Sequence, residues 1–223
     1  MEEYTRMPTI GESAPAFEAV TTQGTIRFPE DYKGKWVILF SHPADFTPVC
    51  TTEFMTFASM LEEFRALNTE LIGLSVDSLY AHIAWLRKIQ ELEWKDKRHV
   101  EVTFPLIEDI RMEVAHKYGM IQPGASNTQA VRAVFVIDPQ AVIRTILYYP
   151  LTTGRNFDEI KRIVQALQIA DEQNCATPAD WRPGEDVIVP TAGSCGTAKE
   201  RMESSDENQY CLDWFLCFRK LKA

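Results

Sequence analysis

Residues 36–53 read WVILFSHPADFTPVCTTE, and this stretch predicts both the fold and the chemistry of the chain. Its apolar start, residues 36–40, is typical of a buried strand, and an amphipathic helical pattern follows its end. A short loop bracketed by Pro43 and Pro48 joins the two, so Cys50 falls in the first turn of a helix. The unpaired amides at a helix start favour a thiolate over a thiol. We therefore predict a small, partly shielded pocket around one reactive thiolate.

The composition limits the class of protein. The chain has 223 residues, of which 45% are hydrophobic and 25% charged, as in an ordinary soluble globular protein. A net charge of -9 argues against nucleic acid or an anionic membrane as the main partner. No apolar run approaches the roughly 20 residues that span a bilayer. The first residues are acidic and lack the pattern of a signal peptide, so we expect a cytoplasmic protein.

Hydrophobic periodicity alternates between strand and helix along most of the chain. It predicts strands over residues 35–40, 71–76 and 103–106, and a β-hairpin formed by 131–137 and 141–148. It predicts helices over residues 50–67, 79–89 and 110–118, the last closed by Gly119, and a long helix from Phe157. Asp77 and Ser78 form a candidate cap for the helix that follows them. This order predicts an α/β domain with a mixed central sheet and helices on both faces.

The sequence changes character from Cys175 onward. Residues 176–184 are rich in turn-forming side chains, and residues 198–205 form a charged segment that predicts a short helix. Apolar side chains then gather near the end, at Leu212, Trp214, Phe215, Leu216 and Phe218. Because so short a tail cannot form its own core, we expect it to pack on the same domain or on a partner subunit.

The motif Pro43-x-x-x-Thr47-x-x-Cys50 matches the active-site motif of the peroxiredoxins. The residues around it resemble the branch that contains the one-cysteine type and its archaeal-like relatives. Further resemblance runs through LSVDS at 74–78, TTGRNFDE at 152–159 and ATPADW at 176–181. The ending YCLDW at 210–214, with a further cysteine at 217, resembles the archaeal-like subgroup. The resemblance covers nearly the whole chain.

This resemblance implies a thioredoxin-like fold and reduction of hydrogen peroxide and alkyl hydroperoxides without a cofactor. Residues 1–174 would form the peroxidase domain, and residues 175–223 a dimerisation extension that carries resolving cysteines. Cys50 would attack the peroxide within a pocket made by Pro43, Thr47 and Arg132. The resemblance also implies homodimers that assemble into rings of five dimers. A thioredoxin-like dithiol donor would reduce the oxidised enzyme for the next cycle.

Physical chemistry supports roles for Thr47 and Arg132. A free cysteine is only about 3% thiolate at pH 7, so full ionisation gains about 30-fold, which cannot by itself make an efficient peroxidase. The larger effect should be stabilisation of charge on the leaving oxygen, to which a threonine hydroxyl and a fixed guanidinium are suited. The alternative for Arg132 is a surface arginine at a strand end. Arg155, which precedes a helix, is a weaker candidate, and a surface or capping role stays open for it.

The tail cysteines predict how the oxidised thiol is resolved. A tail thiol would condense with the Cys50 sulfenic acid to form a disulfide. The alternative is that both tail cysteines are buried spectators. By analogy with archaeal-like members we favour an intermolecular bond from Cys217, with Cys211 exchanging with it. Cys195, in a flexible stretch, and Cys175 have no counterpart that we can match, and we interpret both as bystanders.

Other classes of function were weighed against the peroxidase. A thioredoxin-type dithiol oxidoreductase normally needs a second cysteine at position 53, where this chain has glutamate. An oligomeric holdase or a redox sensor is a non-enzymatic alternative. Some one-cysteine relatives have a phospholipase serine, but Lys35 stands in that position, so we expect no phospholipase activity. The spacing of the histidines and cysteines predicts no metal site.

Overall fold

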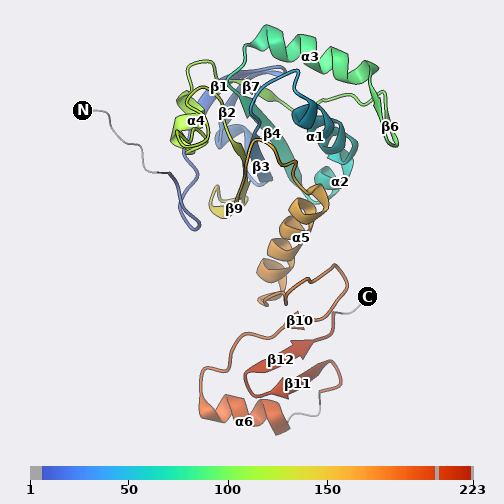
Figure 1. Ribbon diagram of the computed structural model, residues 1–223. Helices are drawn as coiled ribbons and strands as arrows, with labels where there is room; N and C mark the ends of the chain where they lie inside the picture. The colour runs from blue at the N-terminus through green and yellow to red at the C-terminus, as the bar shows by residue number, and fades with distance from the viewer. Residues whose placement is uncertain (1–6, 204–205, 222–223) are drawn as a thin grey trace, which may run out of the picture. The chain divides into compact units, whose positions relative to one another are not determined.

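The computed structural model describes residues 7–203 and 206–221, and the chain divides into two compact units, Met1–Phe157 and Asp158–Ala223. The first unit is built on a seven-stranded sheet (Figure 1). β3 pairs in parallel with β4, and β4 with β7, whereas the other neighbours are antiparallel. The predicted mixed sheet is therefore confirmed. In spatial order its strands are β2 (Gly24–Phe28), β1 (Phe17–Thr21), β7 (Leu106–Glu108), β4 (Thr69–Ser75), β3 (Trp36–Ser41), β8 (Arg132–Ile137) and β9 (Ile143–Tyr149).

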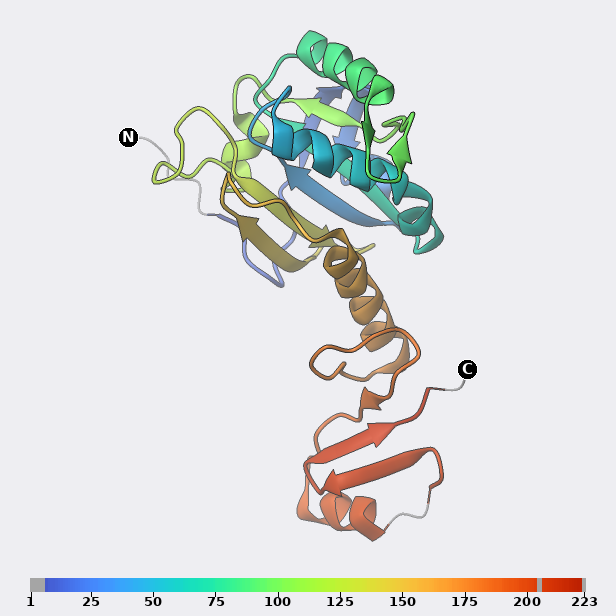
Figure 2. The ribbon, with the colours of Figure 1, turned by 45° about the vertical axis from the view of Figure 1, so that its right-hand side comes forward.

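Helices cover both faces of this sheet, as predicted. Every residue of β3 is buried, and alternate side chains point to opposite faces. Leu39 joins a cluster with Tyr118, just after helix α4 (Glu113–Lys117). Phe40 packs against Phe57 of helix α1 (Pro48–Ser59), with ring centroids 4.5 Å apart. Figure 2 shows α1 lying across the sheet, and helices α2 (Leu61–Ala66) and α3 (Leu79–Glu91) complete the unit.

The helix predicted over residues 50–67 is two helices rather than one. The first helix, α1, has Thr47 as its N-cap, in an extended backbone conformation. Pro48 occupies the first helical position, where the missing N–H of proline costs nothing. The helix ends at Ser59, and α2 begins after Met60. Several hydroxyls of α1 donate to the backbone carbonyl three or four residues before them, including Ser59 to the oxygen of Thr56. Such bonds bend a helix, which accounts for the break.

Two further elements are shorter or displaced from their predicted positions. The strand predicted over residues 103–106 begins only at Leu106, because Pro105 has no N–H to donate to a ladder. The helix predicted over residues 110–118 is α4, which starts at Glu113 because Met112 has a left-handed backbone with φ 58°. The carboxylate of Asp109 accepts from the first free amides of α4. Gly119, with φ 63°, closes the helix as predicted.

Other predictions near the sheet are confirmed. Ser78 caps α3 by accepting from the amide of Ala81. Strands β8 and β9 form the predicted hairpin, and the carboxylate of Asp138 accepts from amides in its turn. The sequence analysis assigned no structure before residue 35, where β1 and β2 form an antiparallel hairpin around Gly24. It also missed the short helix η1 (Glu30–Tyr32) and the small hairpin of β5 (Glu93–Trp94) and β6 (Lys97–Arg98).

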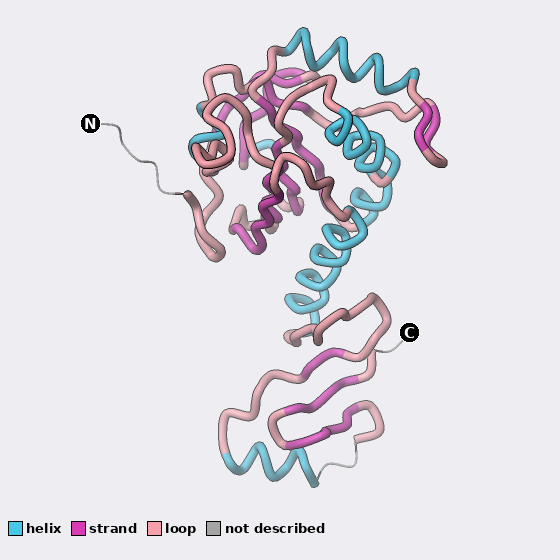
Figure 3. Tube along the Cα trace, viewed as in Figure 1, coloured by secondary structure: helices cyan, strands magenta, loops and turns pink. Residues whose placement is uncertain are grey.

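The second unit contains most of helix α5 (Phe157–Gln173) and a small three-stranded antiparallel sheet (Figure 3). Its strand order is β10 (Val187–Ile188), β12 (Leu216–Arg219) and β11 (Gln209–Asp213). Helix α6 (Cys195–Glu203) starts earlier than the predicted helix at 198–205, whose last two residues lie outside the described residues. The two compact units divide at the N-terminal end of α5, whereas the predicted domain boundary between residues 174 and 175 follows its C-terminal end. That boundary stays a prediction. Within the described residues, no helix has both the length and the apolar character needed to cross a membrane.

Candidate functional site

Cys50 lies in the first turn of α1, where the sequence predicted it. The turn begins at Pro48, so the thiol is at the third helical position, among backbone amides that have no partner within the helix. Its side chain is fully buried. Pro43 is buried in the loop before it, and Thr47 is partly buried. The sulfur therefore sits in a shielded place beside the positive end of a helix dipole.

Arg132 is the cation that reaches the sulfur. It is the first residue of β8 and is almost fully buried, which excludes the surface position that was the alternative for it. Its Nη1 lies 3.2 Å from the Cys50 sulfur and 2.8 Å from a carboxylate oxygen of Glu53. Nε and Nη2 both donate to the carbonyl of Leu151, at 3.1 and 2.8 Å. The guanidinium is thus held from the far side and directed at the sulfur.

Glu53 and Arg155 complete a buried charge network around this arginine. Arg155 donates to both carboxylate oxygens of Glu53, through Nη2 at 2.6 Å and through Nε and its backbone amide. Its Nη1 donates to the carbonyls of Ser41 and Ala133. The surface or capping role left open for Arg155 is therefore wrong, because the side chain is buried. Burial opposes the charge on Glu53, but Arg155 and then Arg132 outweigh it and lower the pKa of Glu53.

The buried network carries more positive than negative charge. Arg132 and Arg155 supply two positive charges, and ionised Glu53 supplies one negative charge. Because an uncompensated buried charge is costly, the site suits an oxygen that gains negative charge beside Arg132. Sequence reasoning missed Glu53, although its position three residues after Cys50 puts it on the same side of α1.

Thr47 directs its hydroxyl proton away from the sulfur. Its Oγ1 donates to the carbonyl of Ala44 at 2.8 Å. A hydroxyl that has given its proton in this way presents lone pairs to any other neighbour. Thr47 is therefore arranged to accept a hydrogen bond from an O–H group that approaches Cys50. Stabilisation of charge on the leaving oxygen, the role expected of Thr47, needs a hydroxyl proton that this bond to Ala44 already uses, so that role falls to Arg132.

A second buried polar cluster holds the loop that leads to Cys50. Asp45 lies 2.9 Å from Nε2 of His42 and 2.7 Å from Nδ1 of His82, one histidine on each carboxylate oxygen. Burial opposes the charge on Asp45, but these two hydrogen bonds lower its pKa, whereas burial lowers the pKa of His42. His42 therefore orients the loop before Cys50 through its hydrogen bond to Asp45. Its Nδ1 is buried and has no partner among the described residues.

His42, Asp45 and Asp77 also place three possible metal ligands within 4.8 Å of one another. The spacing of histidines and cysteines alone does not reveal this group, because two of its members are aspartates. Both oxygens of Asp45 are engaged by histidines, and one oxygen of Asp77 accepts from Ser75 and from the amide of Asp45. Hydrogen bonds thus account for the cluster.

The C-terminal unit holds the remaining cysteines. Cys211 of β11 and Cys217 of β12 are directly paired across the strands and form a disulfide. The spectator alternative described both as buried thiols, and a disulfide between them does not fit it. Cys195 is a free, exposed thiol at the start of α6, and Cys175 is a free, partly buried thiol after α5.

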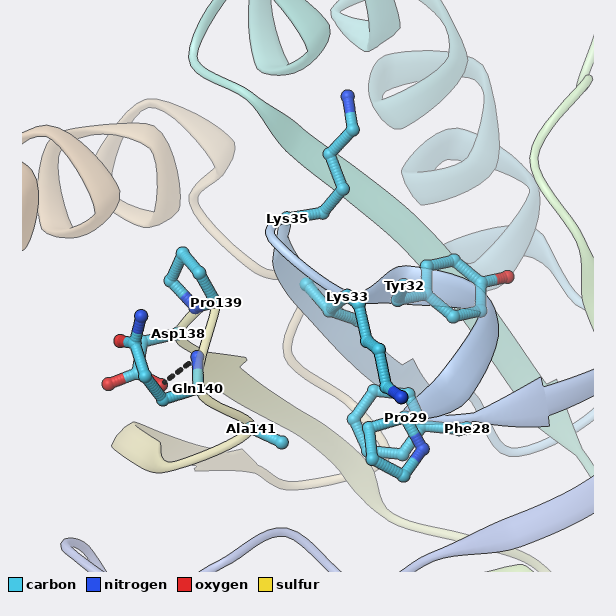
Figure 4. Close-up of a pocket in the computed structure, with 10 residues that line it drawn as sticks. Phe28, Pro29, Tyr32, Lys33, Lys35, Asp138, Pro139, Gln140 and Ala141 are labelled. Atoms are coloured by element: carbon cyan, nitrogen blue, oxygen red, sulfur yellow. Dashed lines mark hydrogen bonds between the residues drawn. The ribbon is translucent and has the colours of Figure 1, made fainter.

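A separate cavity of about 230 Å³ lies between η1 and the turn of the β8–β9 hairpin (Figure 4). Its lining is mainly apolar and includes Phe28, Tyr32 and Pro139. Lys35, which stands where some relatives have a phospholipase serine, extends away from the other labelled side chains in Figure 4. Lysine rather than serine therefore occupies that position in the wall of the cavity.

Two family models match the chain. Residues 10–146 match the AhpC/TSA family, and residues 166–205 match the C-terminal domain of 1-Cys peroxiredoxin. The chain is 67% identical to a peroxiredoxin of Methanosarcina mazei over 215 residues, which cover 96% of this chain and 98% of the relative. It is 51% identical to a peroxiredoxin of Methanocaldococcus jannaschii, with 96% and 100% covered.

The solved structures that share this fold include peroxiredoxins. A yeast mitochondrial 1-Cys peroxiredoxin, solved to explain its thiol resolving mechanism via glutathione/thioredoxin systems, has a TM-score of 0.82 and 38% identity. The alignment covers 96% of this chain and 100% of that one. Peroxiredoxin 6 of Arenicola marina has a TM-score of 0.80 and 32% identity, with 97% and 100% covered. The thioredoxin-like fold predicted with a C-terminal extension is confirmed.

Proposed function

Since this chain belongs to the AhpC/TSA family of peroxiredoxins and is a thiol-dependent peroxidase, we propose that Cys50 is the thiolate that attacks hydrogen peroxide and alkyl hydroperoxides. One observation carries this proposal. Nη1 of Arg132 touches the Cys50 sulfur and Glu53 together, at 3.2 and 2.8 Å. A guanidinium held in this way favours the thiolate before reaction and the departing oxygen during it.

The first step is a displacement at oxygen. The sulfur of Cys50 forms a bond to one peroxide oxygen, and the O–O bond breaks with its electron pair on the other oxygen. That oxygen leaves as hydroxide or alkoxide, takes a proton and departs as water or alcohol. Arg132 stabilises the charge moving onto it, and Thr47 accepts from the O–H of the oxygen under attack. The product is a sulfenic acid on Cys50.

The second step uses the C-terminal cysteines. A tail thiol, by preference Cys217 of a neighbouring subunit, condenses with the sulfenic acid and releases water. Cys211 then attacks Cys217, which frees the Cys50 thiol and leaves a bond between the tail residues. The disulfide between Cys211 and Cys217 in the structure is the product that this sequence of steps requires. A thioredoxin-like dithiol donor returns both tail residues to thiols.

A tail that serves a neighbouring subunit requires assembly. We therefore propose a cytoplasmic homodimer and its association into a decamer. The exposed side chains of Tyr210 and Leu212 on β11 support a surface that another subunit covers, because exposed apolar patches mark interaction sites.

Peptide mapping after one equivalent of hydrogen peroxide tests the resolving step. The wild type should yield a linkage between Cys50 and Cys217 that gives way to one between Cys211 and Cys217. A Cys211→Ser variant should accumulate the first linkage as a covalent dimer on a non-reducing gel. A Cys175→Ser variant is the matched control and should behave as wild type.

A Cys50 sulfenic acid that persists with both tail thiols free would disprove resolution by the tail. It would favour direct reaction with an external thiol, for which the glutathione/thioredoxin systems of the yeast relative are a precedent. Peroxide consumption by Cys50→Ser separates the enzyme from a holdase. Undiminished consumption by this variant would refute the thiol mechanism, and suppression of aggregation without turnover would support the holdase.

A further inference from the structure

The C-terminal unit contains a groove that the peroxidase reaction does not explain. A cavity of about 420 Å³ lies between the start of α6 and the turn that joins β11 to β12. Five of its lining residues are small, and the sixth, Trp214, forms an aromatic wall that is 48% exposed. The residues that line it are Ala192, Gly193, Ser194, Cys195, Ala198 and Trp214.

This groove adjoins the disulfide of the tail. The sulfur of Cys217 lies 3.7 Å from the carbonyl oxygen of Asp213 and 4.0 Å from that of Trp214. The sulfur of Cys211 lies 3.8 Å from the carbonyl oxygen of Arg201 in α6. The disulfide therefore lies against the same helix and the same turn that form the walls of the groove.

The two cysteines of this disulfide differ in exposure. Cys217 is 1% exposed, whereas Cys211 is only partly buried. Thiol–disulfide exchange requires the attacking thiolate to approach one sulfur directly, so an incoming thiol should attack Cys211. The bond then breaks toward Cys217, which leaves as the thiolate.

The groove and the proposed subunit surface lie on opposite faces of the small sheet. Cys211 and Cys217 form a directly opposed pair whose side chains face α6. Tyr210 pairs with Phe218, and their stacked rings belong to the other face because side chains alternate along a strand. A partner that occupies the groove therefore does not compete for that other face.

We propose that this groove is the docking site for a dithiol protein that reduces the Cys211–Cys217 bond, an inference that rests on the proposed function. One thiolate of that protein bonds to the sulfur of Cys211, and Cys217 leaves and takes a proton. The second thiol of the protein then attacks its own mixed disulfide and releases Cys211. Two electrons pass from the dithiol to the tail, and the donor leaves as a disulfide.

The lining of the groove favours a protein over a small thiol as the occupant. A small thiol reaches an accessible sulfur without apolar contact, whereas exposed tryptophans are typical anchors of protein interfaces. Phe215, the next residue after Trp214, is 54% exposed, and its ring centroid lies 5.6 Å from that of Trp214, so it extends the apolar surface beside it. Cys195 is a wall residue in this arrangement and not the exchanging thiol. Six residues of α6 separate it from Arg201, a rise of about 9 Å.

The test compares two reductants on one preformed disulfide. The Cys211–Cys217 bond is generated with hydrogen peroxide, and its reduction is followed with recombinant thioredoxin and, separately, with dithiothreitol. Ala198→Glu places a charged side chain in the groove and should lower the ratio of the thioredoxin rate to the dithiothreitol rate at least 10-fold. Trp214→Ser, which removes the aromatic wall, should lower this ratio as well. Lys199→Gln makes the same change of net charge on the next, exposed residue of α6 and should leave the ratio unchanged.

Several results would overturn the proposal. An unchanged ratio in both groove variants, or wild-type protein that thioredoxin does not reduce, removes the docking site. A changed oligomeric mass of Ala198→Glu in light scattering would assign the groove to a second copy of this chain. Failure of the proposed function is a separate result, because the Cys211–Cys217 bond would then not form in wild-type protein during peroxide turnover.

Discussion

Replacing Arg132 by glutamine should slow the reaction of Cys50 with hydrogen peroxide by about 10- to 150-fold. The change removes the contact of 3.2 Å between Nη1 and the sulfur, together with the positive charge that stabilises the leaving oxygen. A hydrogen bond to a charged group contributes about 1.5–3 kcal/mol. At about 1.4 kcal/mol for each factor of ten, this range corresponds to the loss in rate that we expect.

Replacing Arg132 by lysine separates charge from geometry. An ammonium keeps the positive charge but lacks the planar fork of five donors. It cannot hold the Leu151 carbonyl on one side while it bridges Cys50 and Glu53 on the other, as the guanidinium does. We expect this variant to lose about tenfold in rate, less than the glutamine variant, because it loses geometry alone.

The assay is pre-steady-state stopped-flow fluorescence, which gives the second-order rate constant for peroxide independently of any reductant. The indole of Trp85 is buried and donates to Thr51, the neighbour of Cys50, so it is suited to report oxidation. Arg144→Gln is the matched control, because Arg144 of β9 pairs with Asp138 in the turn of the β8–β9 hairpin, away from the sulfur. An Arg132→Gln rate within twofold of wild type would refute the reasoning.

Three further predictions concern the buried polar groups. Glu53→Gln should lower the free energy of unfolding by about 3–5 kcal/mol, because it leaves two buried arginines without their carboxylate; a urea midpoint equal to wild type would contradict this. The lowered pKa of Glu53 means that its stabilisation is complete above its unfolded pKa, near 4.3, and is lost as pH falls through the lower folded value. Urea unfolding between pH 7 and pH 3 should show this loss in wild type and less of it in Glu53→Gln, and identical profiles would exclude it. Tyr118→Phe should cost about 1–3 kcal/mol, because the carbonyl of Pro15 loses its donor at 2.7 Å; thermal unfolding measures this, and an unchanged Tm would count against it.

Local pattern predicted the elements whose signals lie within a few residues of each other. β3, a helix start close to Cys50 and the β8–β9 hairpin depend on an apolar run, a proline and a tight turn, and all three were found, with the helix beginning two residues earlier than predicted, at Pro48. Boundaries were less predictable. The break at Met60 and the left-handed backbone at Met112 arise from hydrogen bonds that hydrophobic periodicity does not record.

The residues around the Cys50 sulfur were likewise predictable from the sequence only in part. Arg132 was a candidate because a charge inside an apolar strand is conspicuous. Glu53 was not, since a glutamate on a helix usually faces water, and Arg155 was only a weaker candidate, with a surface or capping role left open. These two residues lie 102 positions apart, and their partnership exists only when α1 and the segment before α5 are brought together.

The amino-acid order alone specified a cysteine at a helix start and a mixed α/β core. It also specified membership of the peroxiredoxin family, through the motif of Pro43, Thr47 and Cys50. These are short-range properties, because backbone propensity and periodicity act over a few residues. Tertiary structure alone decided which charges surround the sulfur and which cysteines join one another. Burial strengthens interactions between charges, but only folding determines which distant groups share the same buried space.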